Sequence, residues 1–199
     1  MHHSDVVKKA NAVFRSIDTY SANFKIKITE EKKTRTLSGK AYYKKGGKLN
    51  FTFYEPAGDK IISDGKTLWV YIAKLRAVGR QPYSKKSLAA RASMEGVLNL
   101  FRYYHYNFDS PQQPRKTDVG NAYVLQLKEK TASGGLEKML VYIDAKNYII
   151  KKIQGIAAGG RKVEIRLSNI KLNPEIAPEK FEYKLRAGVK VVDNPLTTD

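Results

Sequence analysis

Apolar residues recur at two different spacings along the chain of 199 residues. From Ser4 to about Thr19 they fall at helical spacing and form one stripe, so this segment is predicted to be a helix with Ser4 as its N-cap. After Tyr20 the spacing changes to two, which is typical of a strand with one face in water. In this first predicted strand apolar residues alternate with charged ones, in the order Phe24, Lys25, Ile26, Lys27 and Ile28.

Short runs with strand character follow in quick succession. The predicted strands span residues 37–43, 49–54, 60–63, 67–72, 104–108, 122–129, 137–144, 148–156, 161–172 and 181–185. Asp64-Gly65 and three Gly-Gly pairs separate several of these runs, and glycine supplies the positive φ angles that hairpin turns need (residues 46–47, 134–135 and 159–160). The series predicts a mainly β fold with some α-helix: one curved antiparallel sheet, rolled into a full or an incomplete, half-open barrel.

The middle of the chain returns to helical spacing. Residues 85–103 are predicted to form two short helices that are broken near Ser93, and Ser93 is suited to cap the second of them. Gly96 weakens that second helix. Because this insert falls between two halves of the predicted sheet, we expect it to cover the mouth or the concave face.

The charge balance indicates the sign of a binding partner. Lys and Arg number 37 against 19 acidic residues, a formal net charge of +18. Such a surface attracts nucleic acid, anionic lipid headgroups or an acidic protein. No apolar stretch approaches the length of a membrane-spanning helix, and the absence of cysteine excludes disulfides and thiolate metal sites.

Catalytic and cofactor-binding patterns are weak. His105 stands alone among tyrosines and is expected to be a packed or edge residue. Gly65-Lys66-Thr67 resembles the end of a phosphate-binding loop, but Lys60 occupies the position where that loop needs its first glycine. We therefore expect a turn there, no metal, no cofactor and no enzymatic activity.

The length fits a single domain. We expect residues 4–199 to form it, and we interpret Met1-His2-His3 as the remnant of a removed signal peptide or tag.

One stretch of the chain resembles a known family. It consists of Glu55-Pro56 and then Ile61-Ile62-Ser63-Asp64-Gly65-Lys66-Thr67-Leu68-Trp69-Val70-Tyr71. It is similar to the central signature of the outer-membrane lipoprotein carrier (LolA-like) family, in which a strand ends in Pro and the next turns at Ser-Asp-Gly into a Leu-Trp strand. Supporting matches lie at Tyr20-Ser21-Ala22-Asn23-Phe24, Gly39, Asn173-Pro174, Ile176, Phe181, Gly188-Val189 and Val191.

The resemblance implies an incomplete β-barrel with helices over a hydrophobic cavity. It implies a periplasmic chaperone, expected to be a monomer, that accepts lipoprotein acyl chains from an inner-membrane release complex and carries them to the outer membrane. The implied partners also include an outer-membrane receptor, and the basic surface adds anionic lipid headgroups. Nucleic acid is not expected as a partner.

Alternation within the predicted elements supplies candidates for the cavity. They are Leu49, Phe51, Phe53, Trp69, Tyr71, Val97, Leu98 and Phe101. Simple core packing is the alternative for each of them. The family usually carries an arginine linked to lid closure and cargo transfer, and alignment places Lys45 at that position, which keeps the charge without the planar guanidinium.

Other functions stay open at this point. A lipid-anchored outer-membrane receptor, or a lipoprotein-sensing domain, would use the same half-barrel. A module that binds polyanions or nucleic acid would use the basic surface together with interleaved aromatic residues.

Overall fold

The computed structural model describes residues 1–85, 90, 93–131 and 135–195, apart from the side chains of Glu95 and Leu98. The chain begins with helix α1 (His3–Arg15), which starts before the predicted Ser4. The ring Nδ1 of His2 accepts a hydrogen bond from the Ser4 backbone N–H at 3.4 Å, and the Asp5 carboxylate accepts one from the His2 N–H at 3.2 Å. His2, and not Ser4, therefore caps the helix.

Most of the remaining chain is β-strand. The strands are β1 (Thr19–Glu30), β2 (Lys33–Lys44), β3 (Lys48–Glu55), β4 (Lys60–Asp64), β5 (Thr67–Ile72), β6 (Ala77–Pro82), β7 (Tyr104–Phe108), β8 (Arg115–Thr117), β9 (Gly120–Glu129), β10 (Leu136–Asp144), β11 (Ile150–Ala157), β12 (Lys162–Leu172) and β13 (Lys190–Asp193). Short 3₁₀ helices lie at η1 (Ala73–Leu75), η2 (Ala158–Gly160) and η3 (Pro178–Phe181).

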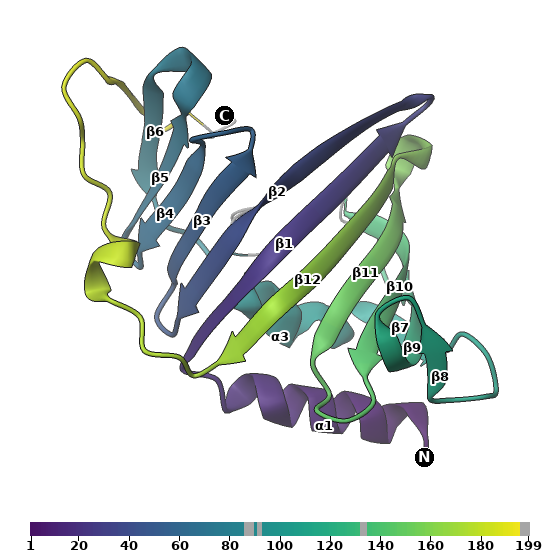
Figure 1. Cartoon of the computed structure of the whole chain (residues 1–199). Coiled ribbons are helices and arrows are strands. Elements are labelled where there is room, and N and C mark those ends of the chain that lie inside the picture. The colour runs from purple at the N-terminus through teal and green to yellow at the C-terminus, as the bar shows by residue number, and fades with distance from the viewer. Residues whose placement is uncertain (86–89, 91–92, 132–134, 196–199) are drawn as a thin grey trace. The chain divides into compact units, whose positions relative to one another are not determined.

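The strands pair in one path, β13-β6-β5-β4-β3-β2-β1-β12-β11-β10-β9-β7, and β8 pairs with β9 (Figure 1). β13 runs parallel to β6, and the pairs from β2 to β6 and from β9 to β12 are antiparallel. Over the described residues β7 and β13 end this path, so the sheet is not closed into a barrel. The predicted fold class, an incomplete antiparallel barrel with an N-terminal helix, is confirmed.

The second of the two short helices predicted for the central insert is confirmed. Helix α3 (Met94–Tyr103) begins directly after Ser93, as predicted. The other predicted helix falls largely on residues 86–89 and 91–92, which lie outside the described residues. No helix in the described part of the chain is both long and apolar enough to cross a membrane.

One predicted strand is wrong. Residues 181–185 do not form a strand, because Pro178 starts the 3₁₀ helix η3 at its first turn and this helix ends at Phe181. Phe181 is buried, and residues 182–185 after it belong to no strand. The hydrophobic pattern also did not indicate β6, β8 and β13.

The described chain divides into two compact units. Unit 1 contains residues 1–16, 25–36 and 97–168, and unit 2 contains residues 17–24, 37–96 and 169–199. The side chains of unit 1 with no exposed surface come from α1 and from β9 and β10: Val6, Ala10, Ala122, Val124, Leu125, Leu127, Val141 and Ile143. In unit 2 the most buried large apolar residues are Ile17, Leu49, Leu68, Val78 and Phe181.

Candidate functional site

Unit 2 presents an apolar sheet face. We call the set Leu49, Phe51, Phe53, Ile61, Leu68 and Val70 the apolar face. Alternate residues of β3 point to this side, and the register pairs Phe51 with Ile61 and Ile61 with Val70. Leu49 and Leu68 are buried, whereas Phe51, Ile61 and Val70 pack against them and keep part of their surface open. A row of large apolar groups that is only partly covered can contact an apolar ligand.

Phe24 extends the apolar face through a close approach at Gly39. The Phe24 ring meets Phe51 and Phe53 edge-on, with centroids 5.9 and 5.3 Å away. A Cβ on Gly39 would lie 2.8 Å from the Phe24 ring and 2.2 Å from the backbone oxygen of Thr52. Only glycine fits under this ring, which gives a physical reason for the Gly39 that supported the family resemblance.

Trp69 and Tyr71 lie on the other side of the same sheet. Trp69 pairs with Ile62, and Ile62 pairs with Asn50, so these residues face away from Phe51. The Trp69 ring stacks on Tyr183 at 5.2 Å, and the Tyr71 ring lies 6.3 Å from Tyr183. The structure therefore separates these two cavity candidates from Leu49, Phe51 and Phe53.

The C-terminal segment covers this opposite side. The Asn50 side chain Nδ2 donates a hydrogen bond of 2.6 Å to the Lys180 carbonyl, and Phe181 is 2% exposed. Arg80 lies over the Trp69 ring and donates to Asp193 Oδ1 at 2.7 Å. Trp69 thus packs between Tyr183 and Arg80 and is not open to a ligand on the apolar face.

The candidates on α3 belong to unit 1. Phe101 is buried and its ring meets Tyr106 edge-on at 5.7 Å. Val97 is half-buried, and the Leu98 side chain lies outside the described residues. The sequence did not single out Ile61, Leu68, Val70 or Phe24, although their alternation was visible, because only the strand register shows which of them share a face with Phe51.

Lys45 follows the end of β2 and forms an ion pair. Its Nζ lies 3.0 Å from Asp18 Oδ1, and both side chains are exposed. Its backbone N–H also donates to the Asp18 carbonyl at 2.9 Å. Lys45 therefore contacts the residue directly before β1 within unit 2.

We expect Lys45→Ala to lower the free energy of unfolding by less than about 1 kcal/mol, because exposed ion pairs contribute little and the backbone hydrogen bond remains. Urea denaturation of Lys45→Ala and of Asp18→Ala would measure this. Equal small losses are expected for the two variants, and a loss above about 2 kcal/mol would contradict a solvated pair.

The turn at Asp64 has the geometry of a hairpin. The Asp64 carboxylate accepts hydrogen bonds of 2.8 Å from the backbone N–H groups of Lys66 and Thr67. Burial raises the pKa of Asp64, but these hydrogen bonds, with Thr67 first, lower it overall. The expected turn, rather than a phosphate loop, is confirmed here. Among the described residues no three His, Asp or Glu side chains are arranged to hold a metal.

One protein-family model matches most of the chain. Residues 15–184 match the model of the family described as outer membrane lipoprotein carrier protein LolA. The chain belongs to the LolA family. The resemblance drawn from the Ser-Asp-Gly and Leu-Trp signature is thereby confirmed.

One curated relative carries the name of this family, and two solved structures share the fold. An outer-membrane lipoprotein carrier protein of Methylobacillus flagellatus is 26% identical over 192 residues, which cover 95% of this LolA-family chain and 89% of the relative. An uncharacterized conserved protein from Thermus thermophilus shares the fold with a TM-score of 0.63 at 11% identity, over 96% of this chain and 98% of that one. The Mycobacterium tuberculosis lipoprotein LppX shares it with a TM-score of 0.51 at 12% identity, over 87% of this chain and 96% of that one.

Proposed function

We propose that this LolA-family protein is a periplasmic chaperone that binds the acyl chains of lipoproteins against its apolar face and carries them from the inner to the outer membrane. The observation that supports this most directly is the half-covered row of Phe51, Ile61 and Val70, on a sheet that is not closed. The family name supplies the class of cargo, and the apolar face supplies a surface of matching chemistry.

The physical requirement of such a carrier is to hide hydrocarbon from water. Each buried methylene contributes about 0.8 kcal/mol, so free acyl chains favour aggregation or return to a membrane. Phe24, Phe51 and Phe53 offer aromatic edges and faces, which contact a flexible chain without fixing one conformation of it. The proposed role needs binding and release, and no group that makes or breaks covalent bonds.

An extraction experiment tests this function. Inner membranes that carry a triacylated lipoprotein and its release complex are incubated with the purified protein and ATP. We expect a soluble one-to-one complex on gel filtration. A lipoprotein that lacks its acylated cysteine is the control and should not join the complex. Lipoprotein that stays in the membrane fraction would overturn the proposal.

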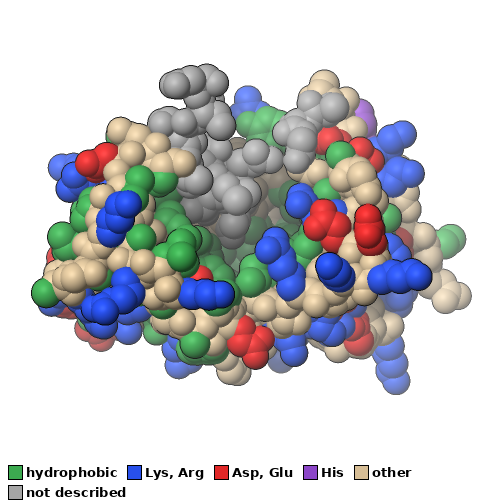
Figure 2. All heavy atoms as spheres, turned by 90° about the horizontal axis from the view of Figure 1, so that it is seen from above, with side chains coloured by type: hydrophobic (Ala, Val, Ile, Leu, Met, Phe, Trp, Pro, Cys, Tyr) green, Lys and Arg blue, Asp and Glu red, His purple; other side chains and the backbone are tan. Residues whose placement is uncertain are grey.

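The same experiment separates the carrier from a lipid-anchored receptor of the same fold. A carrier returns to the soluble fraction after it delivers cargo to outer membranes, whereas a receptor stays in those membranes. The basic surface gives less support to a polyanion binder, because Lys and Arg side chains are spread over the visible face with acidic and apolar side chains among them (Figure 2).

A further inference from the structure

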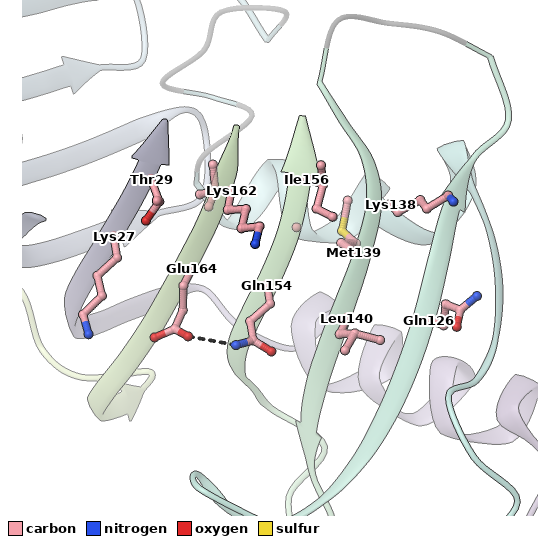
Figure 3. Close-up of a pocket in the computed structure, with 12 residues that line it drawn as sticks. Lys27, Thr29, Gln126, Lys138, Met139, Leu140, Gln154, Ile156, Lys162 and Glu164 are labelled. Carbon is pink, nitrogen blue, oxygen red and sulfur yellow. Dashed lines mark hydrogen bonds between the residues drawn. The ribbon is translucent and has the colours of Figure 1, made fainter. Parts of the chain in front are cut away.

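Unit 1 has a pocket that acyl binding on the apolar face of unit 2 does not use. Its volume is about 600 Å³, and its lining comes from β1, β12, β11, β10 and β9 (Figure 3). We call it the lysine pocket, after Lys27, Lys138 and Lys162. All of its lining residues belong to unit 1.

The strand register places two cross-strand rows on one side of the sheet. In the first row Ile156 has Lys162 and Lys138 as its partners on the two neighbouring strands. In the second row, two residues along, Gln154 has Glu164 and Leu140 as partners, and Leu140 also pairs with Gln126. Leu125 and Val141 pair on the opposite side, where both are fully buried. The pocket therefore lies on the side of the sheet away from that core.

The three lysines give this pocket a local positive charge. In the part of the chain that the structure describes, Lys27, Lys138 and Lys162 have no carboxylate within 4.0 Å. Among the described lining residues Glu164 is the only acidic one, and it is already bound by Arg166 Nε at 2.7 Å and by Gln154 Nε2 at 2.8 Å. Burial raises the pKa of Glu164, but the Arg166 and Gln154 hydrogen bonds lower it overall, so Glu164 stays charged and paired.

The charges facing the pocket from β11, β12 and the turn before β9 cancel among themselves. Lys152 is buried, and its Nζ lies 2.8 Å from Asp118 Oδ2 and 3.9 Å from Glu164 Oε2. Arg166 also contacts Asp118. Two cations and two carboxylates form this network, so its net charge is zero. The positive field of the three lysines is left for a ligand.

The pocket also offers apolar surface between the lysines. Ile156 is 43% exposed, and Leu140 is half-buried beside it. A ligand that suits both features carries an anionic group next to hydrocarbon or glycerol carbon. The volume is in the range of small-molecule sites, between about 300 and 1,000 Å³.

We propose that the lysine pocket binds the phosphate headgroup of an anionic phospholipid and so holds the protein at a membrane surface. Lys162, which lies between Lys27 and Lys138 (Figure 3), contacts the phosphate oxygens, and the two flanking lysines add to the positive field, while Ile156 and Leu140 contact the glycerol and the first acyl carbons. This site shares no residue with the apolar face, so the proposal for the lysine pocket can be wrong while the proposed acyl-chain binding stands.

Vesicle binding by the full chain tests the proposal. The triple variant Lys27→Gln, Lys138→Gln, Lys162→Gln is compared with the triple variant Lys8→Gln, Lys116→Gln, Lys146→Gln, which removes equal charge from exposed lysines elsewhere in unit 1. Partitioning onto vesicles with phosphatidylglycerol in phosphatidylcholine is measured by sedimentation. A lysine at an anionic surface contributes about fivefold to binding. We expect the pocket variant to lose at least about tenfold more affinity than the control variant.

Three outcomes would overturn the proposal. Equal losses in the two triple variants would mean attraction by net charge alone. Tight binding of a soluble acidic peptide to the pocket, with no preference for phosphatidylglycerol vesicles, would make it a protein-docking site. In an NMR titration with short-chain phosphatidylglycerol, shifts should gather at residues 138–140, 154–156 and 162–164, and shifts confined to the apolar face would also contradict it.

Discussion

Phe181→Ala is expected to destabilise the protein by about 3–5 kcal/mol, the usual cost of truncating a buried phenylalanine. Phe181 is the last residue of η3. Its side chain is 2% exposed and lies on the side of the sheet opposite the apolar face. Its loss would leave a cavity beneath the C-terminal segment and would weaken the Trp69–Tyr183 stack beside it. Urea denaturation followed by tryptophan fluorescence would report both effects, because Trp69 is the single tryptophan of the chain.

Leu185→Ala is the matched control for Phe181→Ala. Leu185 lies in the same segment but is 56% exposed, so its truncation should change the free energy of unfolding by less than about 0.5 kcal/mol. If Phe181→Ala cost less than about 1 kcal/mol, the C-terminal segment would not be packed on the sheet as described.

Phe51→Ser is expected to weaken lipoprotein binding by at least about tenfold and to leave the fold intact. Phe51 is at the centre of the apolar face, where it contacts Phe24 and pairs with Ile61, yet it is only half-buried. An acyl chain that covers a phenylalanine gains about 1.5–3 kcal/mol, and serine removes that gain. The fraction of lipoprotein extracted from membranes, at a series of carrier concentrations, would measure the change.

Tyr54→Ser tests whether the side of the strand matters. Tyr54 lies on β3 three residues from Phe51, is 57% exposed and points to the opposite side of the sheet. Extraction by Tyr54→Ser should match that of the unchanged protein. Equal losses in Phe51→Ser and Tyr54→Ser would place the acyl chains somewhere other than the apolar face.

The hydrophobic pattern predicted the strands well and their faces only in part. Alternation in β3 places Leu49, Phe51 and Phe53 on one side, and the structure agrees. Alternation in β5 likewise places Trp69 and Tyr71 on one side of their strand, but it does not show which side of the sheet they face. That choice depends on the register between β4 and β5, a relation between strands that no single segment contains.

Pairings between strands that are far apart in the chain could not be predicted from the sequence for the same reason. β13 pairs with β6, whose residues Ala77–Pro82 include a glycine and a proline and carry a weak strand pattern. The lysine pocket draws side chains from five strands, and Lys138 is indistinguishable in sequence from many other exposed lysines. The cross-strand partners of Ile156 bring Lys138 and Lys162 to one place, and the pairing of β1 with β12 adds Lys27.

The pairing of β1 with β12 also bears on how the chain reaches its final state. β1 is the first strand, and its neighbour in the sheet is formed by residues near the end of the chain. A growing or truncated chain that lacks β12 keeps one edge of β1 open, and such edges invite wrong pairing. Long-range strand pairing is also slow, because distant segments must meet before they are stabilised. The sheet can be completed only after β12 has been made, and until then the free edge of β1 must stay unfolded or be shielded from other chains.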